Sequence, residues 1–317
     1  MLRSMFAGVS GLRNHQIKMD VIGNNIANAN THGYKTSRTT FAEMFNQTLA
    51  GATRPSQALG GLNPKQVGLG VSTSSIDVVF TTGGMMTTDR MLDLAIQGDG
   101  FISVLNGDDI FYTRAGNLYL DENGFLVAAN GMMIMGVNLL DHEYFDSAFE
   151  AIDVDGGRTI EELGVKDPQE LGDLFDPEFG GRIDPDNYEE ALGPLAIPLN
   201  FVSISIDKTG LVTGIDAEGE LRDIAVIPLA CFVNAPGLTR EGDNLYRVSS
   251  NSGIPGYYQP GQGGVAGEVR AGALEMSNVD LSKEFTDMII TQRGFQANSR
   301  IITVSDTLLE ELINLKR

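Results

Sequence analysis

The sequence predicts a mainly β protein with a long α-helix at each end and several domains. Three observations predict this class: helical spacing of apolar residues at both termini, short alternating runs between them, and charge that is segregated along the chain. At 317 residues, 42% of them hydrophobic, the chain is long enough to bury a sizeable core.

The N-terminal segment has the apolar spacing of one amphipathic helix of about 25 residues. Its stripe consists of Leu2, Met5, Val9, Leu12, Met19, Ile22 and Ile26. Gly8, Gly11 and Gly23 each lower the intrinsic stability of a helix by about 1 kcal/mol relative to Ala. We therefore expect this helix to require a packing partner.

Asparagines gather at the end of this helix, in DVIGNNIANANTHGYK. Asn24 and Asn28 are four residues apart, and Asn25 and Asn28 are three apart, so their amides form a polar patch beside the stripe. Because an amide both donates and accepts, such residues can bond backbone or another amide across a helix contact. The spacing equally fits an ordinary fraying helix end, closed by Asn30 or Gly33.

A second long helix is expected near the C-terminus. Apolar residues recur there at strict heptad spacing, at Leu281, Met288, Phe295, Ile302 and Leu309, with Phe285, Met276 and Ile313 on or near the same face. The intermediate positions Gln292, Ser299 and Asp306 are polar. We therefore expect several neighbouring helices, rather than one coiled-coil partner, to set its register.

The region between the helices has the texture of antiparallel β-domains. Runs such as VSISIDKTGLVTGI and LYLDENGFLVAANG alternate in polarity, and DENG and DKTG are placed as hairpin loops. Residues 46–70 are rich in Gly, Pro, Gln, Ser and Thr without a sustained period, which is typical of an extended linker. Cys231, in the apolar run IPLACFVNAP, is expected to be a packed and inert thiol.

An acidic block follows the first β-region. Residues 141–200 carry 17 Asp and Glu against 3 Lys and Arg, whereas residues 1–80 carry 7 basic and 3 acidic side chains. We expect 141–196 to be an inserted, solvent-facing outer module. The remaining divisions are a helical domain from 1–45 and 275–317, the linker 46–70, and a β-rich middle domain from 71–140 and 197–274.

Several functions are disfavoured by the sequence. A net charge of −20 argues against general binding to nucleic acid or anionic membrane, and no run approaches the ~18 apolar residues that span a bilayer. The common hydrolase, nucleotide and zinc motifs are absent, so we expect no catalytic residue, cofactor or metal. Counted from Asp153, an EF-hand loop would place Arg158 at its glycine position, so the calcium motif fails.

The segment GNNIANANTHGYK resembles the N-terminal signature of the bacterial flagellar rod and hook family, Asn-Asn-Ile/Leu-Ala-Asn followed by Thr-x-Gly-Phe/Tyr-Lys. The matching residues are Asn24, Asn25, Ile26, Ala27, Asn28, Thr31, Gly33, Tyr34 and Lys35. The segment LEMSNVDLSKEFTDMIITQRGFQANSRIITVSDTLLEELINLK is similar to the family's C-terminal helix. Similarity extends to LDLAIQGDGFISV, FYTRAGNLYLDENGFLV and REGDNLYRVSSNSG in the β-region.

The resemblance implies an axial protein that polymerises helically, with paired terminal helices lining an inner tube and antiparallel β-domains outside. The start of the chain, with GGLNPKQVGLGV, is more similar to hook subunits than to distal-rod subunits. A torque-transmitting hook subunit is therefore expected, with a distal-rod subunit as the alternative. A different class, a β-rich ligand-binding protein or enzyme with dimerising helices, also fits the pattern alone.

The resemblance also implies the partners: further copies of the chain, neighbouring rod, hook-cap and hook–filament junction proteins, and the flagellar export apparatus. Export to the outside of the cell without a cleaved signal peptide is consistent with Arg13, His15 and Lys18, which interrupt the N-terminal apolar run. The expected self-assembly interface comprises Leu2, Met5, Val9, Leu12, Met19, Ile22, Asn24, Asn25, Ile26, Asn28, Leu281, Phe285, Met288, Gln292, Phe295, Ile302 and Leu309.

Overall fold

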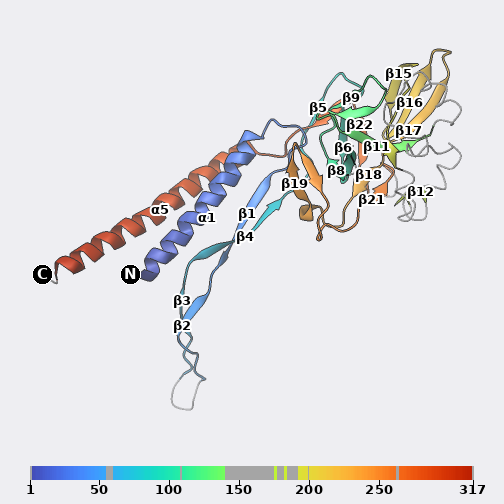
Figure 1. The fold of residues 1–317 in the computed structure, drawn as a ribbon. Helices are drawn as coiled ribbons and strands as arrows, with labels where there is room; N and C mark the ends of the chain where they lie inside the picture. The colour runs from blue at the N-terminus through green and yellow to red at the C-terminus, as the bar shows by residue number, and fades with distance from the viewer. Residues whose placement is uncertain are drawn as a thin grey trace. The chain divides into compact units, whose positions relative to one another are not determined.

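The computed structural model describes residues 2–54, 60–107, 109–139, 175–176, 182–183, 192–198, 200–261 and 264–315 (Figure 1). The chain divides into two compact units. The helical unit comprises Met1–Ala29, Lys35–Val79 and Val279–Arg317, and the β-body comprises Asn30–Tyr34 and Phe80–Asn278. A mainly β fold with a long helix at each end confirms the predicted class.

Two long helices dominate the helical unit. They are α1 (Leu2–Ala27) and α5 (Leu281–Asn314), which lie side by side in Figure 1. The helix α5 begins after Asp280, whose side chain accepts hydrogen bonds from the backbone N–H groups of Ser282 and Lys283 at 2.9 and 3.3 Å. This cap satisfies two of the donors that a helix N-terminus leaves without intrahelical partners.

Four strands complete the helical unit as two antiparallel pairs. The strands are β1 (Ser37–Glu43), β2 (Asn46–Ala50), β3 (Lys65–Gly68) and β4 (Val71–Val78), paired as β1 with β4 and β2 with β3. Residues 46–70, expected to be an extended linker, contain a hairpin ribbon instead. It was missed because its apolar residues are few and are separated by Gly, Pro and polar residues.

The β-body is built from short antiparallel strands. Its largest sheet has 15 of the described strands, with the central order β12-β13-β21-β18-β7-β11-β17-β16-β15. The strand bounds are β5 (Met85–Thr87), β6 (Leu94–Gln97), β7 (Phe101–Asn106), β8 (Asp109–Thr113), β9 (Leu118–Leu120), β10 (Leu126–Ala128), β11 (Met133–Asn138), β12 (Phe175–Asp176), β13 (Arg182–Ile183), β14 (Gly193–Pro194), β15 (Phe201–Ile206), β16 (Leu211–Asp216), β17 (Leu221–Val226), β18 (Leu229–Cys231), β19 (Thr239–Gly242), β20 (Leu245–Arg247), β21 (Gly256–Tyr258), β22 (Glu268–Ala271) and β23 (Ala273–Glu275).

The two predicted hairpin loops are confirmed. Gly124 N–H donates to Asp121 O between β9 and β10, and Gly210 N–H donates to Asp207 O between β15 and β16, each at 3.0 Å. Both glycines have positive φ, 82° and 73°, a conformation that costs Gly little and other residues more. These turns fix the register in which apolar strand faces meet in the core.

The boundary of the acidic module differs from the expected residue 196. Most of 141–196 lies outside the described residues, but β14 pairs with β11, and Leu195 and Ala196 are fully buried in the larger core cluster. Leu192 is buried in the second core cluster. The end of the segment therefore belongs to the β-body, because its apolar residues complete a core that the charge count of the whole block concealed.

Candidate self-assembly interface

The helices α1 and α5 pack antiparallel. Gly8 lies against Ile302, and Lys18 pairs with Asp287 at 3.8 Å. A Cβ added to Gly11 would lie 2.6 Å from Asn298 Nδ2, and one added to Gly294 would lie 2.8 Å from the His15 ring. These glycines therefore allow a close approach between the helices, which accounts for their cost in intrinsic helix stability.

The face of α5 toward α1 combines the predicted heptad with small polar residues. Thr291 and Ser305 are buried, and each hydroxyl donates to the carbonyl four residues earlier at 2.7 Å. Together with Asn298 they occupy the positions three residues after Met288, Phe295 and Ile302. The intermediate positions expected from the sequence, Gln292, Ser299 and Asp306, lie four residues after the same three heptad residues. Gln292 and Asp306 are exposed. The helix faces α1 with residues three positions after each heptad residue, and not with those four positions after it.

The other residues of the expected interface fall into three groups by the burial of their side chains in the single chain. Ile22 and Asn25 are buried; Met5, Leu12, Met19, Ile26, Asn28, Met288, Phe295, Ile302 and Leu309 are partly buried; Val9, Asn24, Leu281 and Phe285 are exposed. The Leu2 side chain lies outside the described part of the structure. In the single chain, therefore, part of the expected interface packs internally and part remains open.

The buried Asn25 of the N-terminal signature binds the first residue of β1. Asn25 Nδ2 donates to Ser37 O at 2.9 Å, and Ser37 N–H donates to Asn25 Oδ1 at 3.0 Å. Asn14 acts similarly, since its Nδ2 donates to Val71 O and its Oδ1 accepts from Thr73 Oγ1. These amides fasten α1 to β1 and β4, whereas Asn28 donates to Asn24 on the helix surface.

The helix α5 has a second apolar face, which its heptad spacing did not predict. Its members recur at helical spacing and are 44 to 58% exposed: Ile290, Ile301, Val304, Leu308 and Leu312. We call this set the outer stripe. The heptad search concealed it, because these residues fall between the repeats that pack on α1. Neighbouring exposed apolar side chains are typical of interaction sites, so the outer stripe is a candidate contact surface.

Two titratable groups of the helical unit have shifted pKa values. The His15 ring packs edge-on against Phe41, with 6.2 Å between ring centroids, beside a cleft of about 390 Å³. Burial lowers the pKa of His15, and the Lys18 charge lowers it further. Burial raises the pKa of Glu284, while a hydrogen bond with Asn25 opposes that rise.

The second half of the signature is anchored within the β-body. Gly33, at φ 70°, donates its N–H to Glu275 O at 2.8 Å and leaves no room for a Cβ beside the Arg114–Ala115 backbone. Tyr34 is buried, with the Arg240 guanidinium 5.2 Å from its ring centroid. The sequence alone could not show this division, since Asn25 and Gly33 are close in the chain but fasten to different units.

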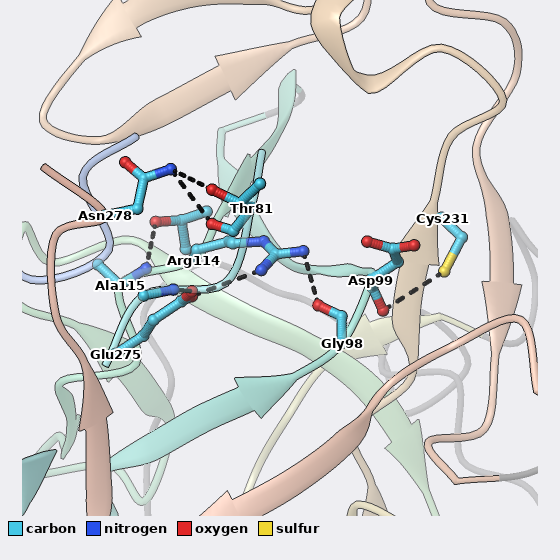
Figure 2. A network of polar contacts seen from close by, with 10 residues as sticks. Thr81, Gly98, Asp99, Arg114, Ala115, Cys231, Glu275 and Asn278 are labelled. Carbon is cyan, nitrogen blue, oxygen red and sulfur yellow. Dashed lines mark hydrogen bonds and ion pairs between the residues drawn. The ribbon is translucent and has the colours of Figure 1, made fainter. Parts of the chain in front are cut away.

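A buried charge pair supports that anchor (Figure 2). Arg114 Nη1 lies 3.5 Å from Glu275 Oε2, both side chains are 1% exposed, and Arg114 Nη2 donates to Gly98 O at 2.9 Å. Nearby, the Cys231 thiol lies 4.0 Å from Asp99 O, and burial raises its pKa to about 11. The thiol therefore stays protonated at neutral pH, as expected of a packed cysteine.

No group of three or more His, Cys, Asp or Glu side chains could hold a metal ion within the described ranges. In the same ranges, no helix is long and apolar enough to cross a membrane. The Asp153 segment considered for calcium lies outside them.

Three family models match the chain. Residues 5–35 match "Flagella basal body rod protein", residues 95–214 match "Flagellar hook protein FlgE/F/G D1 domain", and residues 270–315 match "Flagellar basal body rod FlgEFG protein C-terminal". The first and last coincide with the two terminal motifs.

Curated relatives match along their whole length. The chain is 43% identical over 318 residues to the flagellar basal-body rod protein FlgG of Bacillus subtilis. It is 32% identical to the flagellar hook protein FlgE of Borreliella burgdorferi over an alignment of 442 residues, and 30% identical to FlgG of that species over one of 320 residues. Each alignment covers 100% of both chains.

Proposed function

This chain belongs to the FlgE/F/G family of flagellar rod and hook proteins, and we propose that it polymerises helically into the flagellar hook. The family is structural, and the terminal helices supply the contacts between subunits. The comparisons lend no support to the other class, a ligand-binding protein or enzyme.

The lack of a core in the helical unit carries this proposal. Among its described residues, Ile22 is the only hydrophobic residue that is fully buried, whereas the β-body has two large core clusters. Helices in water draw most of their stability from tertiary packing of an apolar face. Neighbouring copies that cover the outer stripe would supply the missing packing.

Two observations support the hook in this proposal, and the first is a pair of identities within one species. In Borreliella burgdorferi, the chain is 32% identical to the hook protein and 30% identical to the rod protein. The start of the chain also resembles hook subunits. Hook polymerisation would transmit torque from the rod to the filament.

The distal rod is the second candidate. Identity to the rod protein of Bacillus subtilis is 43% over 318 residues, close to the 317 residues of this chain, whereas the hook alignment extends to 442. Localisation of the protein in isolated basal bodies separates the two. Antibody label beyond the outermost ring supports the hook, and label confined within the rings supports the rod.

The same family membership supports the proposed partners. These are adjoining rod, hook-cap and junction proteins, and the export apparatus that would deliver the subunit to the cell exterior without cleavage of a signal peptide. Mass spectrometry of the protein from purified hooks tests export, since an intact N-terminus is expected and a shortened one would contradict it.

Electron microscopy of the concentrated protein tests polymerisation directly, with tubes or short filaments expected. Val304→Asp places a carboxylate on the outer stripe, where it must be desolvated if a neighbour covers it. We expect sedimentable polymer to be lost while the melting of the β-body stays unchanged. Thr303→Asp, at an adjacent exposed position off the stripe, is the control and should still assemble. Normal assembly of Val304→Asp would refute the interface.

A further inference from the structure

The β2–β3 hairpin is an amphipathic ribbon whose two faces are both exposed in the single chain. Every residue of both strands is exposed. Gln47 pairs with Val67, and Leu69 N–H donates to Phe45 O at 3.2 Å. Paired residues share a face, as do alternate residues along one strand, whereas successive residues point to opposite faces. Phe45, Val67 and Leu69 therefore define one largely apolar face, which also carries Gln47.

The opposite face of the ribbon is polar. Thr48 pairs with Gln66, and Gln66 Nε2 donates to Thr48 Oγ1 at 3.1 Å. The apolar face is exposed, with Phe45 at 84% and Val67 at 38%. An isolated two-stranded hairpin is only marginally stable in water, so this face requires a covering surface.

The C-terminal half of α5 offers a surface of matching chemistry. Ile301, Val304 and Leu308 of the outer stripe are exposed there. Glu311 is exposed and lies three residues after Leu308 and seven after Val304, hence on the same face. The C-terminal half of α5, residues 298–314, contains the acidic residues Asp306, Glu310 and Glu311 against one basic residue, Arg300.

The ribbon has the complementary charge. Residues 46–69 contain Arg54 and Lys65 but no Asp or Glu. Lys65, two residues before Val67 on the same strand, lies on the apolar face. An apolar face edged by Lys65 thus matches an apolar stripe edged by Glu311, and such complementarity fixes partner and register.

We propose that the apolar face of the ribbon in one copy docks on the C-terminal half of the outer stripe of α5 in a neighbouring copy. This inference rests on the proposed polymerisation and names the surface that covers the stripe. Lys65 pairs with Glu311 across the contact, while Val67 packs beside Leu308.

Disulfide trapping between two differently labelled copies tests the contact. In a Cys231→Ala background, Val67→Cys protein and Leu308→Cys protein are mixed, polymerised and oxidised by air with a copper catalyst. A dimer band on a non-reducing gel is expected, because a disulfide needs Cα atoms about 4.4 to 6.8 Å apart. Gln66→Cys on the polar face, mixed with Leu308→Cys, is the matched control and should give no dimer.

Charge reversal provides an independent measurement. Lys65→Glu should raise the critical concentration for assembly at least about tenfold, and Glu311→Lys in the same chain should restore it to within about threefold. Failure of the second change to rescue the first would overturn the pairing.

A competing partner for the outer stripe is the exposed face of α1 in a neighbouring copy, where Phe6 is 71% exposed. A dimer from Phe6→Cys with Leu308→Cys, and none from Val67→Cys, would overturn the ribbon contact. If the unsubstituted protein forms no polymer, the proposed function fails. If polymer forms without the Val67–Leu308 dimer, only the ribbon contact fails.

Discussion

Asn25 binds the backbone of Ser37 in both directions, donating from Nδ2 to the carbonyl and accepting at Oδ1 from the N–H. The side-chain amide thus takes the place of a neighbouring strand at the start of β1. It fixes the point at which the chain leaves α1, and with it the placement of β1 beside the helix.

Asn25→Ala should weaken assembly, because it leaves both polar groups of Ser37 without this partner. A loss of about 2 kcal/mol corresponds to a rise of roughly thirtyfold in the critical concentration. Asn28→Ala, which removes exposed hydrogen bonds to Asn24, is the control and should change the critical concentration less than about threefold. Equal effects of the two substitutions would contradict the role of Asn25.

Limited proteolysis should distinguish the two units in dilute protein. The helical unit buries almost no hydrophobic residue completely, so α1 and α5 should be cut early while the β-body persists as a stable fragment. Polymer should protect the same sites. Equal protection of helices and β-body in the dilute monomer would show that the helical unit does not need neighbours.

Two glycines of α1 should respond oppositely to one substitution. A Cβ at Gly23 meets nothing within 4 Å, so Gly23→Ala gains up to about 1 kcal/mol of helix propensity and should lower the critical concentration. Gly11→Ala gains the same propensity but places its Cβ 2.6 Å from Asn298 Nδ2 and should raise that concentration. Adding Asn298→Ala should relieve the contact. A benefit from Gly11→Ala alone would contradict the close helix approach.

Acid should destabilise the helical unit through His15. Its folded pKa is lowered, so the unfolded state binds the proton more tightly, and stability present above pH 6.5 is lost as the pH falls toward the folded pKa. The partial solvation of the ring keeps the effect small. Glu284, with a raised pKa, acts oppositely, since it contributes stability that is present at low pH and is lost as the pH rises through its folded pKa. Polymer melting from pH 7.5 to 5 should therefore be less acid-sensitive for His15→Gln, and an unchanged profile would count against this role.

Leu195→Ala should destabilise the β-body by about 2 to 5 kcal/mol, because Leu195 is fully buried in the larger core cluster. Val202→Ala, at a site 76% exposed, is the matched control and should change stability by less than about 0.5 kcal/mol. Thermal melting measures both. A small effect at Leu195 would restore the view that the whole acidic block is peripheral.

The sequence alone determined the features that local patterns encode. Helical spacing predicted α1 and α5, alternation and turn chemistry predicted the hairpins closed by Gly124 and Gly210, and the terminal motifs indicated the family. Each depends on residues a few positions apart, whose relation the backbone period fixes directly.

Only the tertiary structure decided which residues meet across long separations. Phe295 and Ile302 were predicted to pack. That Thr291 shares their face depends on whether the residues three or four positions after each heptad residue face α1. Likewise, charge composition could not reveal that Leu195 completes the β-body core, nor that Asn25 fastens to Ser37. These outcomes depend on close packing between segments distant in sequence, which composition and period do not encode.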